Sequence, residues 1–324
     1  MIDGFGRNID YIRISVTDRC DLRCVYCMPA RGVRSLAHED ILRYEDILRL
    51  ARIFSKLGIK KVRLTGGEPL ARKNLSYLVA GLKDTDGIET VFLTTNGMLL
   101  SEQLLELVSA GLDGVNISLD AIDENVFQRI TRRSGVDKVL DSIDAALSYP
   151  ELKVKINCVP TKLNESQLIP MTALLVRDNR LALRFIELMP IGLGKRYHGK
   201  SEGEVRSVLE SEFAPMTSLA EDSGGGLCRY FALPGFNGKI GFISAISHKF
   251  CYSCNRVRLT SDGFLKTCLQ YDRGVDLKAL LCEDDKTIKI AIEEAILKKP
   301  ACHHFIDGTL ENHEETRKMS QIGG

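Results

Sequence analysis

Short runs of apolar and β-branched residues alternate along the first half of the chain with longer segments whose apolar residues recur at helical spacing. The helical spacing predicts helices at Tyr44–Leu57 and at Ser101–Ala110, where Ser101 is the expected N-cap. A third helix is predicted at Leu168–Val176, behind a capping box formed by Asn164 and Gln167. The short runs predict six strands: Tyr11–Val16, Lys60–Leu64, Glu89–Thr94, Gly114–Leu119, Leu152–Cys158 and Ala182–Leu188.

Alternation of strands and helices predicts an α/β fold with parallel strands and right-handed crossovers. Six such units exceed a flavodoxin-like sheet and fall short of a complete eight-unit barrel. We therefore predict a partial (βα)6 TIM-type barrel. An open doubly wound sheet is the alternative that the pattern leaves open.

The alternation stops near Met189. Ser201–Glu204 has the pattern of a capping box that opens one more helix, and Glu221–Gly226 is typical of a loop or flexible linker. We predict two regions, a barrel over residues 1–200 and a C-terminal extension over 201–324, with the boundary between 190 and 230. The extension is predicted to contain a hairpin of Cys228–Leu233 and Lys239–Ile246, helices at Asp276–Leu281 and Asp285–Lys299, and a polar tail.

Composition narrows the class of protein. The 324 residues carry 44 Lys and Arg against 43 Asp and Glu, a net charge of +1, so bulk charge indicates no nucleic-acid and no membrane partner. The longest stretch without a charge is Thr90–Ser101, whereas a membrane span needs about 20 residues. The first ten residues lack the apolar segment of a secretion signal, so we expect a cytoplasmic protein, whose ten cysteines would be reduced and available for metal binding or chemistry.

Three cysteines follow the first predicted strand with the spacing C-x3-C-x2-C: Cys20, Cys24 and Cys27, here called the N-terminal cysteine group. In a parallel α/β fold this loop lies at the C-terminal ends of the strands, where active sites collect. A structural zinc would need a fourth ligand, and none is nearby in the sequence, whereas a [4Fe–4S] cluster held by three thiolates keeps one iron open. A zinc site completed from a distance and three buried thiols stay open as alternatives.

The spacing, with Tyr26 before the last cysteine, resembles the radical S-adenosylmethionine (SAM) superfamily. The resemblance implies a partial (βα)6 barrel and a [4Fe–4S] cluster whose open iron is chelated by SAM. Electron transfer from the cluster would then cleave SAM to methionine and a 5′-deoxyadenosyl radical. Thr65-Gly-Gly-Glu-Pro69 resembles the superfamily's glycine-rich stretch. The SAM contacts that the resemblance implies are Tyr26, Gly67, Ser118 and Met189.

A second set of cysteines, Cys251, Cys254 and Cys268, has the spacing C-x2-C-x13-C and is here called the C-terminal cysteine group. A zinc ribbon would need another C-x2-C, so a second cluster with an open iron fits better. Arg256 and Arg258 lie between these ligands, and on a strand they would point to the same face. Guanidinium groups suit phosphate and carboxylate, although an isolated R-x-R is more often a solvated surface.

The two cysteine groups, the R-x-R and the terminal Gly-Gly together resemble the molybdenum-cofactor biosynthesis protein A family, the GTP 3′,8-cyclases, over nearly the whole chain from Arg7 to Gly324. The resemblance implies a lyase with two [4Fe–4S] clusters. It would cyclise GTP to (8S)-3′,8-cyclo-7,8-dihydroguanosine 5′-triphosphate, the first step of molybdenum cofactor biosynthesis. The expected partners are an unidentified electron donor and the downstream enzyme that makes cyclic pyranopterin monophosphate. Whether the chain forms a homodimer is left open.

Family GTP contacts fall on five cations and one hydroxyl, and the last two glycines are implied to reach into the active site. Two departures from the family pattern are Asp21, where Asn is common, and Ala245, where Pro is expected. The remaining cysteines are interpreted as buried or incidental thiols, and His303 and His304 beside Cys302 as no metal site. The implied GTP contacts are Arg13, Arg63, Thr94, Lys155, Arg256 and Arg258, and the implied tail residues are Gly323 and Gly324.

Two other hypotheses compete with this interpretation. A radical SAM enzyme that modifies peptides would carry more cysteines in its C-terminal region and no R-x-R between them. A non-catalytic iron–sulfur sensor or nucleic-acid-binding module would show a basic face and a recognition motif, and the sequence has neither.

Overall fold

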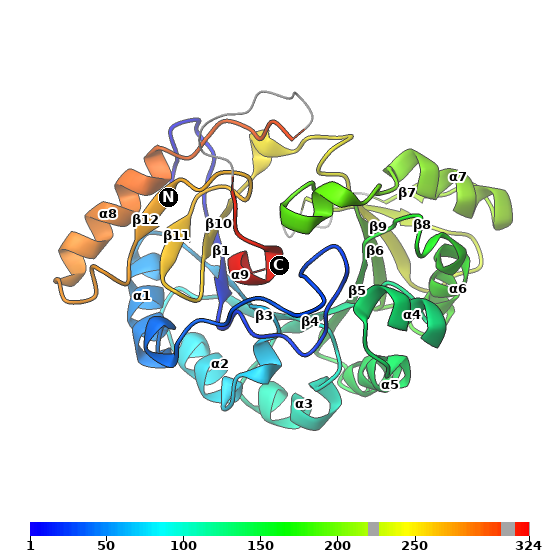
Figure 1. The fold of residues 1–324 in the computed structure, drawn as a ribbon, viewed down its shortest axis with the longest axis horizontal. Helices are drawn as coiled ribbons and strands as arrows, with labels where there is room; N and C mark the ends of the chain where they lie inside the picture. The colour runs from blue at the N-terminus through cyan, green and yellow to red at the C-terminus, as the bar shows by residue number, and fades with distance from the viewer. Residues whose placement is uncertain (220–226, 306–314, 324) are drawn as a thin grey trace.

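The computed structural model describes residues 1–219, 227–305 and 315–323, so the predicted linker Glu221–Gly226 lies outside the described residues. One twelve-stranded sheet curves into an open barrel, with β12 and β7 at its two free edges (Figure 1). Its strands, in the order in which they neighbour one another, are β12 (Gly274–Asp276), β11 (Phe264–Lys266), β10 (Arg256–Leu259), β1 (Tyr11–Ser15), β2 (Lys61–Thr65), β3 (Thr90–Thr95), β4 (Gly114–Ser118), β5 (Lys153–Cys158), β6 (Ala182–Ile186), β9 (Lys239–Ile243), β8 (Arg229–Ala232) and β7 (Thr217–Ser218).

The partial barrel predicted from the sequence is confirmed. Strands β1 to β6 are parallel and neighbour one another in chain order. The C-terminal region lengthens this sheet at both ends, because β10 pairs in parallel with β1 and β9 pairs in parallel with β6. The sheet therefore continues across the predicted boundary at residue 200, and the division into two regions stays a prediction.

Helices cover the convex outside of the sheet, and the short helix α9 lies inside its curve with the C-terminal end of the chain (Figure 1). Neighbouring outer helices contact one another around the barrel, from α8 through α1, α2, α3 and α5, and α6 contacts α7. Within the described residues, no helix is long and apolar enough to span a membrane. The helices are α1 (Tyr44–Lys56), α2 (Leu75–Lys83), α3 (Leu100–Ser109), α4 (Glu124–Thr131), α5 (Val136–Leu147), α6 (Leu168–Ala173), α7 (Glu202–Glu212), α8 (Asp285–Leu297) and α9 (Met319–Ile322).

The strands divide their side chains between a core and a lumen. In β1, Ile12 and Ile14 are each 1% exposed and belong to the hydrophobic core, as do Val62 and Leu64 of β2. Alternate residues of a strand point to opposite faces, so the residues between them, such as Arg13, face the inside of the curve. The outer face thus provides the packing that stabilises the fold, which leaves the inner face available for polar side chains.

Two predicted helix caps are wrong. Helix α3 begins at Leu100, and the N–H of Ser101 donates to Ser142 Oγ at 3.1 Å. Asn164 does not cap α6, since its Oδ1 accepts from the Thr161 N–H at 2.8 Å. The capping box at Ser201 is confirmed, with its Oγ accepting from the Glu204 N–H at 3.3 Å.

The helix predicted at Asp276–Leu281 is also wrong. Gly274–Asp276 forms β12, which pairs antiparallel with β11, and neither of these short strands was predicted. Asp276 Oδ1 then accepts from the Ala279 N–H at 3.1 Å, so the chain turns where a helix was expected. Segments of three residues are too short for periodicity to distinguish a strand from a turn.

Candidate active site

One cavity opens at the C-terminal ends of the barrel strands, and residues far apart in the sequence line it. It receives the loops after β1 to β6, the turn that precedes β10, the residues after β11 and helix α9. Its lining includes all six cysteines of the two groups, together with Arg13, Tyr26, Gly67, Thr94, Ser118, Met189, Arg256 and Arg258. The structure therefore brings most of the residues singled out in the sequence to one place.

The N-terminal cysteine group lies in the loop after β1, and α4 holds that loop from outside the cavity. The Arg23 and Val25 N–H groups donate to the carbonyls of Thr131 and Ile130, each at 2.9 Å. Arg132, at the C-terminal end of α4, donates from Nη1 to the Arg23 carbonyl at 2.9 Å. These backbone contacts fix the loop independently of any metal.

The three thiols of this group are poor acids in the protein. Burial raises the pKa of Cys24 well above its usual value, with further contributions from Cys27 and Asp120. Burial likewise raises the pKa of Cys20, and that of Cys27 to about 11. Thiolates form here when a metal replaces the proton, which fits three sulfur donors around an iron–sulfur cluster. In the described part of the chain no three His, Cys, Asp or Glu side chains converge on a single metal ion, and ligands of separate irons in one cluster have no need to converge.

The residues proposed for SAM lie beside this group. The Tyr26 hydroxyl donates to Asp120 Oδ2 at 2.5 Å, and burial raises the pKa of Asp120 to about 6. Gly67 packs on the cysteine loop so tightly that a Cβ would lie 2.6 Å from the Asp18 carbonyl oxygen, and its N–H donates to the Thr17 carbonyl at 2.7 Å. A side chain at this position would push the two loops apart. Sequence reasoning missed Asp120, which directly follows the fourth predicted strand.

The C-terminal cysteine group surrounds the start of β10. Cys251 opens a 3-10 turn (Cys251–Ser253), and Arg7 donates from Nη1 to its carbonyl at 2.8 Å. Burial alone would raise the pKa of Cys254, but the positive charges of Lys299 and Arg256 outweigh it and leave the pKa below its usual value. A thiol that ionises readily beside two cations is a good metal ligand.

Four arginines form a positive site next to this group, here called the arginine group: Arg63 and Arg258, which are buried, and Arg13 and Arg256, which are half-buried. In the sheet register Arg13 lies opposite both Arg63 and Arg258. Burial lowers the pKa of Arg13, and the neighbouring charge of Arg258 lowers it further. The same two causes, with Arg256 as the neighbour, lower the pKa of Arg258 to about 10. Buried cations that repel one another are favourable when an anion joins them.

Tyr11 reports the strength of this field. Its hydroxyl accepts a hydrogen bond from Arg63 Nε. Burial would raise the pKa of Tyr11, but the charges of Arg63, Arg13 and Arg256 lower it to about 7. The positive charges of the arginine group therefore favour the ionised form of the Tyr11 phenol.

The other predicted GTP contacts lie further along the inner face. Thr94 Oγ1 accepts from Arg63 Nη1 at 3.4 Å, and Lys155 Nζ lies 5.8 Å from the centre of the Tyr230 ring. Arg63 and Lys155 are not among the residues that line the cavity at the C-terminal ends of the barrel strands. The structure shows one more buried cation on a barrel strand that sequence reasoning missed. Arg184 of β6 is 8% exposed and donates from Nε to Asn157 Oδ1 at 2.9 Å. A charge within an apolar strand was the signal that could have found it.

The C-terminal tail enters the barrel. Arg258 Nη1 donates to the Gly323 carbonyl at 2.6 Å, and Ile322 is 1% exposed. Gly323 has a φ of +87°, and a Cβ there would lie 2.7 Å from Thr65 Oγ1, so glycine is required. Gly324 lies outside the described residues. The tail is anchored upstream by a buried ion pair between Lys266 and Glu315, which are 0% and 2% exposed in their side chains.

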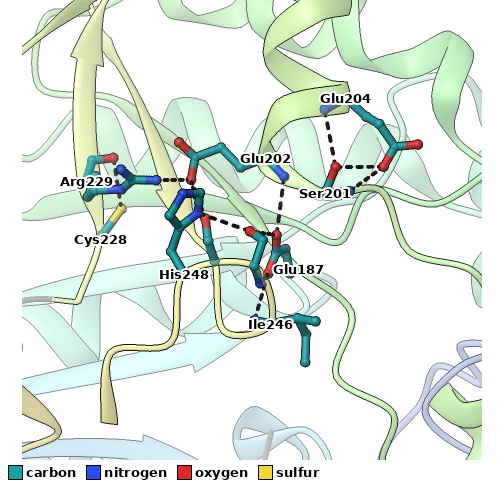
Figure 2. Close-up of polar contacts among 10 residues, drawn as sticks. Glu187, Ser201, Glu202, Glu204, Cys228, Arg229, Ile246 and His248 are labelled. Carbon is teal, nitrogen blue, oxygen red and sulfur yellow. Dashed lines mark hydrogen bonds and ion pairs between the residues drawn. The ribbon is translucent and has the colours of Figure 1, made fainter. Parts of the chain in front are cut away.

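A buried carboxylate connects the loop after β6 to the segment that leads into Cys251 (Figure 2). Glu187 Oε2 accepts from the Ile246 and Ser247 N–H groups at 2.7 and 2.9 Å, and Glu187 Oε1 accepts from the Glu202 N–H at 3.3 Å. Glu202 in turn accepts from Arg229 at 2.5 Å. Glu187 thus holds the approach to the C-terminal cysteine group against the loop that carries Met189, and sequence reasoning missed it.

The cysteines outside the two groups differ in exposure. Cys158 is buried, Cys282 is exposed, and Cys228 and Cys302 are half-buried. Cys302 Sγ lies 3.4 Å from His304 Nε2, beside the C-terminal cysteine group. Ala245, the second departure from the family pattern, is 2% exposed and lines the cavity.

Two known families match parts of this chain. Residues 14–172 match the Radical SAM superfamily, and residues 181–305 match the family described as Molybdenum Cofactor Synthesis C. Among solved structures, Streptococcus suis SuiB superposes with a TM-score of 0.61 at 14% identity, covering 90% of this chain and 67% of that one. A similarity at this identity shows a shared fold and nothing of the activity.

Curated relatives resemble the chain over its full length. The GTP 3′,8-cyclases of Pelotomaculum thermopropionicum and Syntrophomonas wolfei are each 43% identical, and that of Petrotoga mobilis is 41% identical, with 100% of both chains covered in each case. The chain therefore belongs to the GTP 3′,8-cyclase family of the radical SAM superfamily.

Proposed function

We propose that this chain is a GTP 3′,8-cyclase, which converts GTP to (8S)-3′,8-cyclo-7,8-dihydroguanosine 5′-triphosphate in molybdenum cofactor biosynthesis. Full-length relatives at 41–43% identity support the proposal. The observation that carries it is the single cavity lined by both cysteine groups and by three members of the arginine group. A radical SAM enzyme for a nucleotide needs a SAM site and a polyanion site facing one space.

The N-terminal cysteine group is the proposed ligand set of the cluster that binds SAM, with Tyr26, Gly67, Ser118 and Met189 as SAM contacts. When bound, the cluster supplies the electron that cleaves SAM and produces the radical that removes the ribose 3′ hydrogen. The protein's own residues position the SAM contacts and the loops that carry them. Asp120 holds the Tyr26 hydroxyl at 2.5 Å, and Gly67 allows the loop after β2 to close on the cysteine loop.

The C-terminal cysteine group is the proposed ligand set of a second cluster, which would offer an open iron to the guanine base. Beside it, the arginine group, with Thr94 and Lys155, is proposed to bind the triphosphate. Arg256 Nε is buried and has no hydrogen-bond partner among the described residues, which is expected of a donor that awaits a ligand. Arg258 also holds the tail through Gly323, so phosphate binding and tail position share one guanidinium.

The tail is proposed to restrict the cavity around the reacting atoms. Met319 and Ser320 line the cavity, and Ser320 is 2% exposed. A radical on the substrate must be kept from water and from unwanted hydrogen donors, and a backbone with little side chain fits such a space. Gly323 and Gly324 are the proposed active-site end of the tail.

The reaction implies two partners. An electron donor must reduce the cluster before SAM is cleaved, and a downstream enzyme must convert the cyclised nucleotide to cyclic pyranopterin monophosphate. We further propose that the enzyme works in the cytoplasm, where its substrate GTP is available. Whether the chain forms a homodimer can be tested by measuring its mass in solution.

The test is SAM cleavage by the anaerobically reconstituted protein with and without GTP. We expect about eight irons per chain, which corresponds to two [4Fe–4S] clusters. We also expect formation of 5′-deoxyadenosine and of the cyclised nucleotide in equal amounts when GTP is present. Iron content near four, or SAM cleavage that depends on a peptide instead of GTP, would contradict the proposal.

A further inference from the structure

A carboxylate lies directly beside the first ligand of the N-terminal cysteine group. Asp21 Oδ1 is 3.8 Å from Cys20 Sγ. Two donors hold it there, the Leu22 N–H at 3.2 Å and Asn96 Nδ2 at 2.6 Å. The acid is therefore fixed next to the sulfur by its own loop and by the loop after β3.

The orientation of Asn96 is itself determined. Its Oδ1 accepts from the Met98 N–H at 2.9 Å, so its amide nitrogen must face Asp21. Its backbone N–H donates to Glu68 Oε2 at 2.7 Å, and the residue is 8% exposed. Asn96 is thus a positioning residue that keeps the Asp21 carboxylate from turning into solvent.

The Asp21 carboxylate lies 3.8 Å from Cys20 Sγ, so its negative charge would act on a cluster that this sulfur binds. A field that disfavours negative charge on the sulfur also disfavours an added electron on the iron–sulfur cluster that the sulfur binds. Net charge and hydrogen bonds to the sulfurs are two of the properties that set a cluster's reduction potential.

We propose that Asp21 lowers the reduction potential of the cluster at the N-terminal cysteine group and so makes that cluster a stronger reductant of SAM. The proposal rests on the proposed function, which assigns the SAM cluster to this group. It gives a physical role to one of the two departures from the family pattern. Asn in this place would accept from the same two donors but carry no charge, and the loss of the negative charge would favour the reduced cluster.

The experiment is a redox titration of the reconstituted holoenzyme, followed by electron paramagnetic resonance. The SAM-binding cluster is identified as the one whose signal changes when SAM is added. The variants are Asp21→Asn and Asp21→Ala, each with iron counted in the same sample. We expect a less negative midpoint potential for this cluster in both variants, because both remove the negative charge beside Cys20 Sγ. The second cluster is an internal control, and its potential should stay unchanged.

An unchanged or more negative potential in both variants would overturn the proposal, as would an equal shift of both clusters, which would indicate a global change. If neither variant assembles the SAM-binding cluster, Asp21 is a residue of loop folding and the proposal is wrong. Failure of the proposed function is distinguishable, because the parent protein would then show no SAM-sensitive cluster.

Discussion

Arg256 offers the sharpest test of the proposed GTP site. Its Nε is buried without a hydrogen-bond partner among the described residues, and it repels Arg258 and Arg13. Truncation to Ala would relieve this repulsion and would remove the contacts of the guanidinium with the Tyr11 and Phe250 rings, whose centres lie 5.8 and 5.9 Å away. It should also remove charge-assisted hydrogen bonds to the triphosphate, each worth about 1.5–3 kcal/mol. At 1.4 kcal/mol per decade, this predicts a loss of GTP affinity of about 10- to 150-fold.

Arg258→Ala should lose affinity to the same extent for the phosphate contact and should also release the tail, because Arg258 holds the Gly323 carbonyl at 2.6 Å. Arg256→Lys should restore affinity only in part, since an ammonium keeps the charge without the guanidinium fork. The matched control is Arg43→Ala, which removes a positive charge from a side chain that is 76% exposed and pairs with Asp46 in its own helix turn.

The assay is equilibrium GTP binding to anaerobically reconstituted protein, with iron content and SAM binding measured in the same samples. Iron content and SAM binding should match those of the parent protein in Arg256→Ala and Arg258→Ala. If Arg256→Ala and Arg258→Ala bind GTP as tightly as Arg43→Ala does, the triphosphate is held elsewhere and the assignment of these arginines is wrong.

Three further predictions follow from the cysteines and from Tyr11. Replacing any residue of the N-terminal cysteine group by Ala should abolish 5′-deoxyadenosine formation while the second cluster survives, and full SAM cleavage by the triple variant would refute the assignment. Replacing the C-terminal cysteine group by Ala should remove about four irons and abolish the cyclised product while SAM still binds, whereas unchanged iron content would mean that these thiols hold no cluster. The pKa of Tyr11 is lowered to about 7 in the folded protein, whereas that of an unfolded tyrosine is about 10. The ionised Tyr11 should therefore raise the free energy of unfolding increasingly as pH rises from about 7 to about 10, and this contribution should disappear below pH 7. Unfolding free energies across this pH range should therefore differ between the parent and Tyr11→Phe, with GTP reducing the difference by neutralising the arginines, and identical pH profiles would contradict this account.

The sequence by itself determined the features whose signal is local. Six parallel strands were predicted within one residue of their starts, because each combines apolar residues over a run long enough to show period two. The spacing of the two cysteine groups likewise needs only neighbouring residues, and it led directly to the family. Helix caps were predicted less reliably, as Asn164 shows, because its Nδ2 donates to the distant Asp120 carbonyl at 2.9 Å.

Only the tertiary structure decided how these pieces meet. No local pattern states that β10 pairs with β1, yet this pairing places Arg258 opposite Arg13 and brings the C-terminal cysteine group to the cavity of the first. The same holds for the tail, whose polar sequence is typical of a disordered end but whose Gly323 is held by Arg258 inside the barrel. Such contacts join residues that are far apart in the sequence, and their free energy depends on the assembled sheet, on burial and on charge, none of which periodicity encodes.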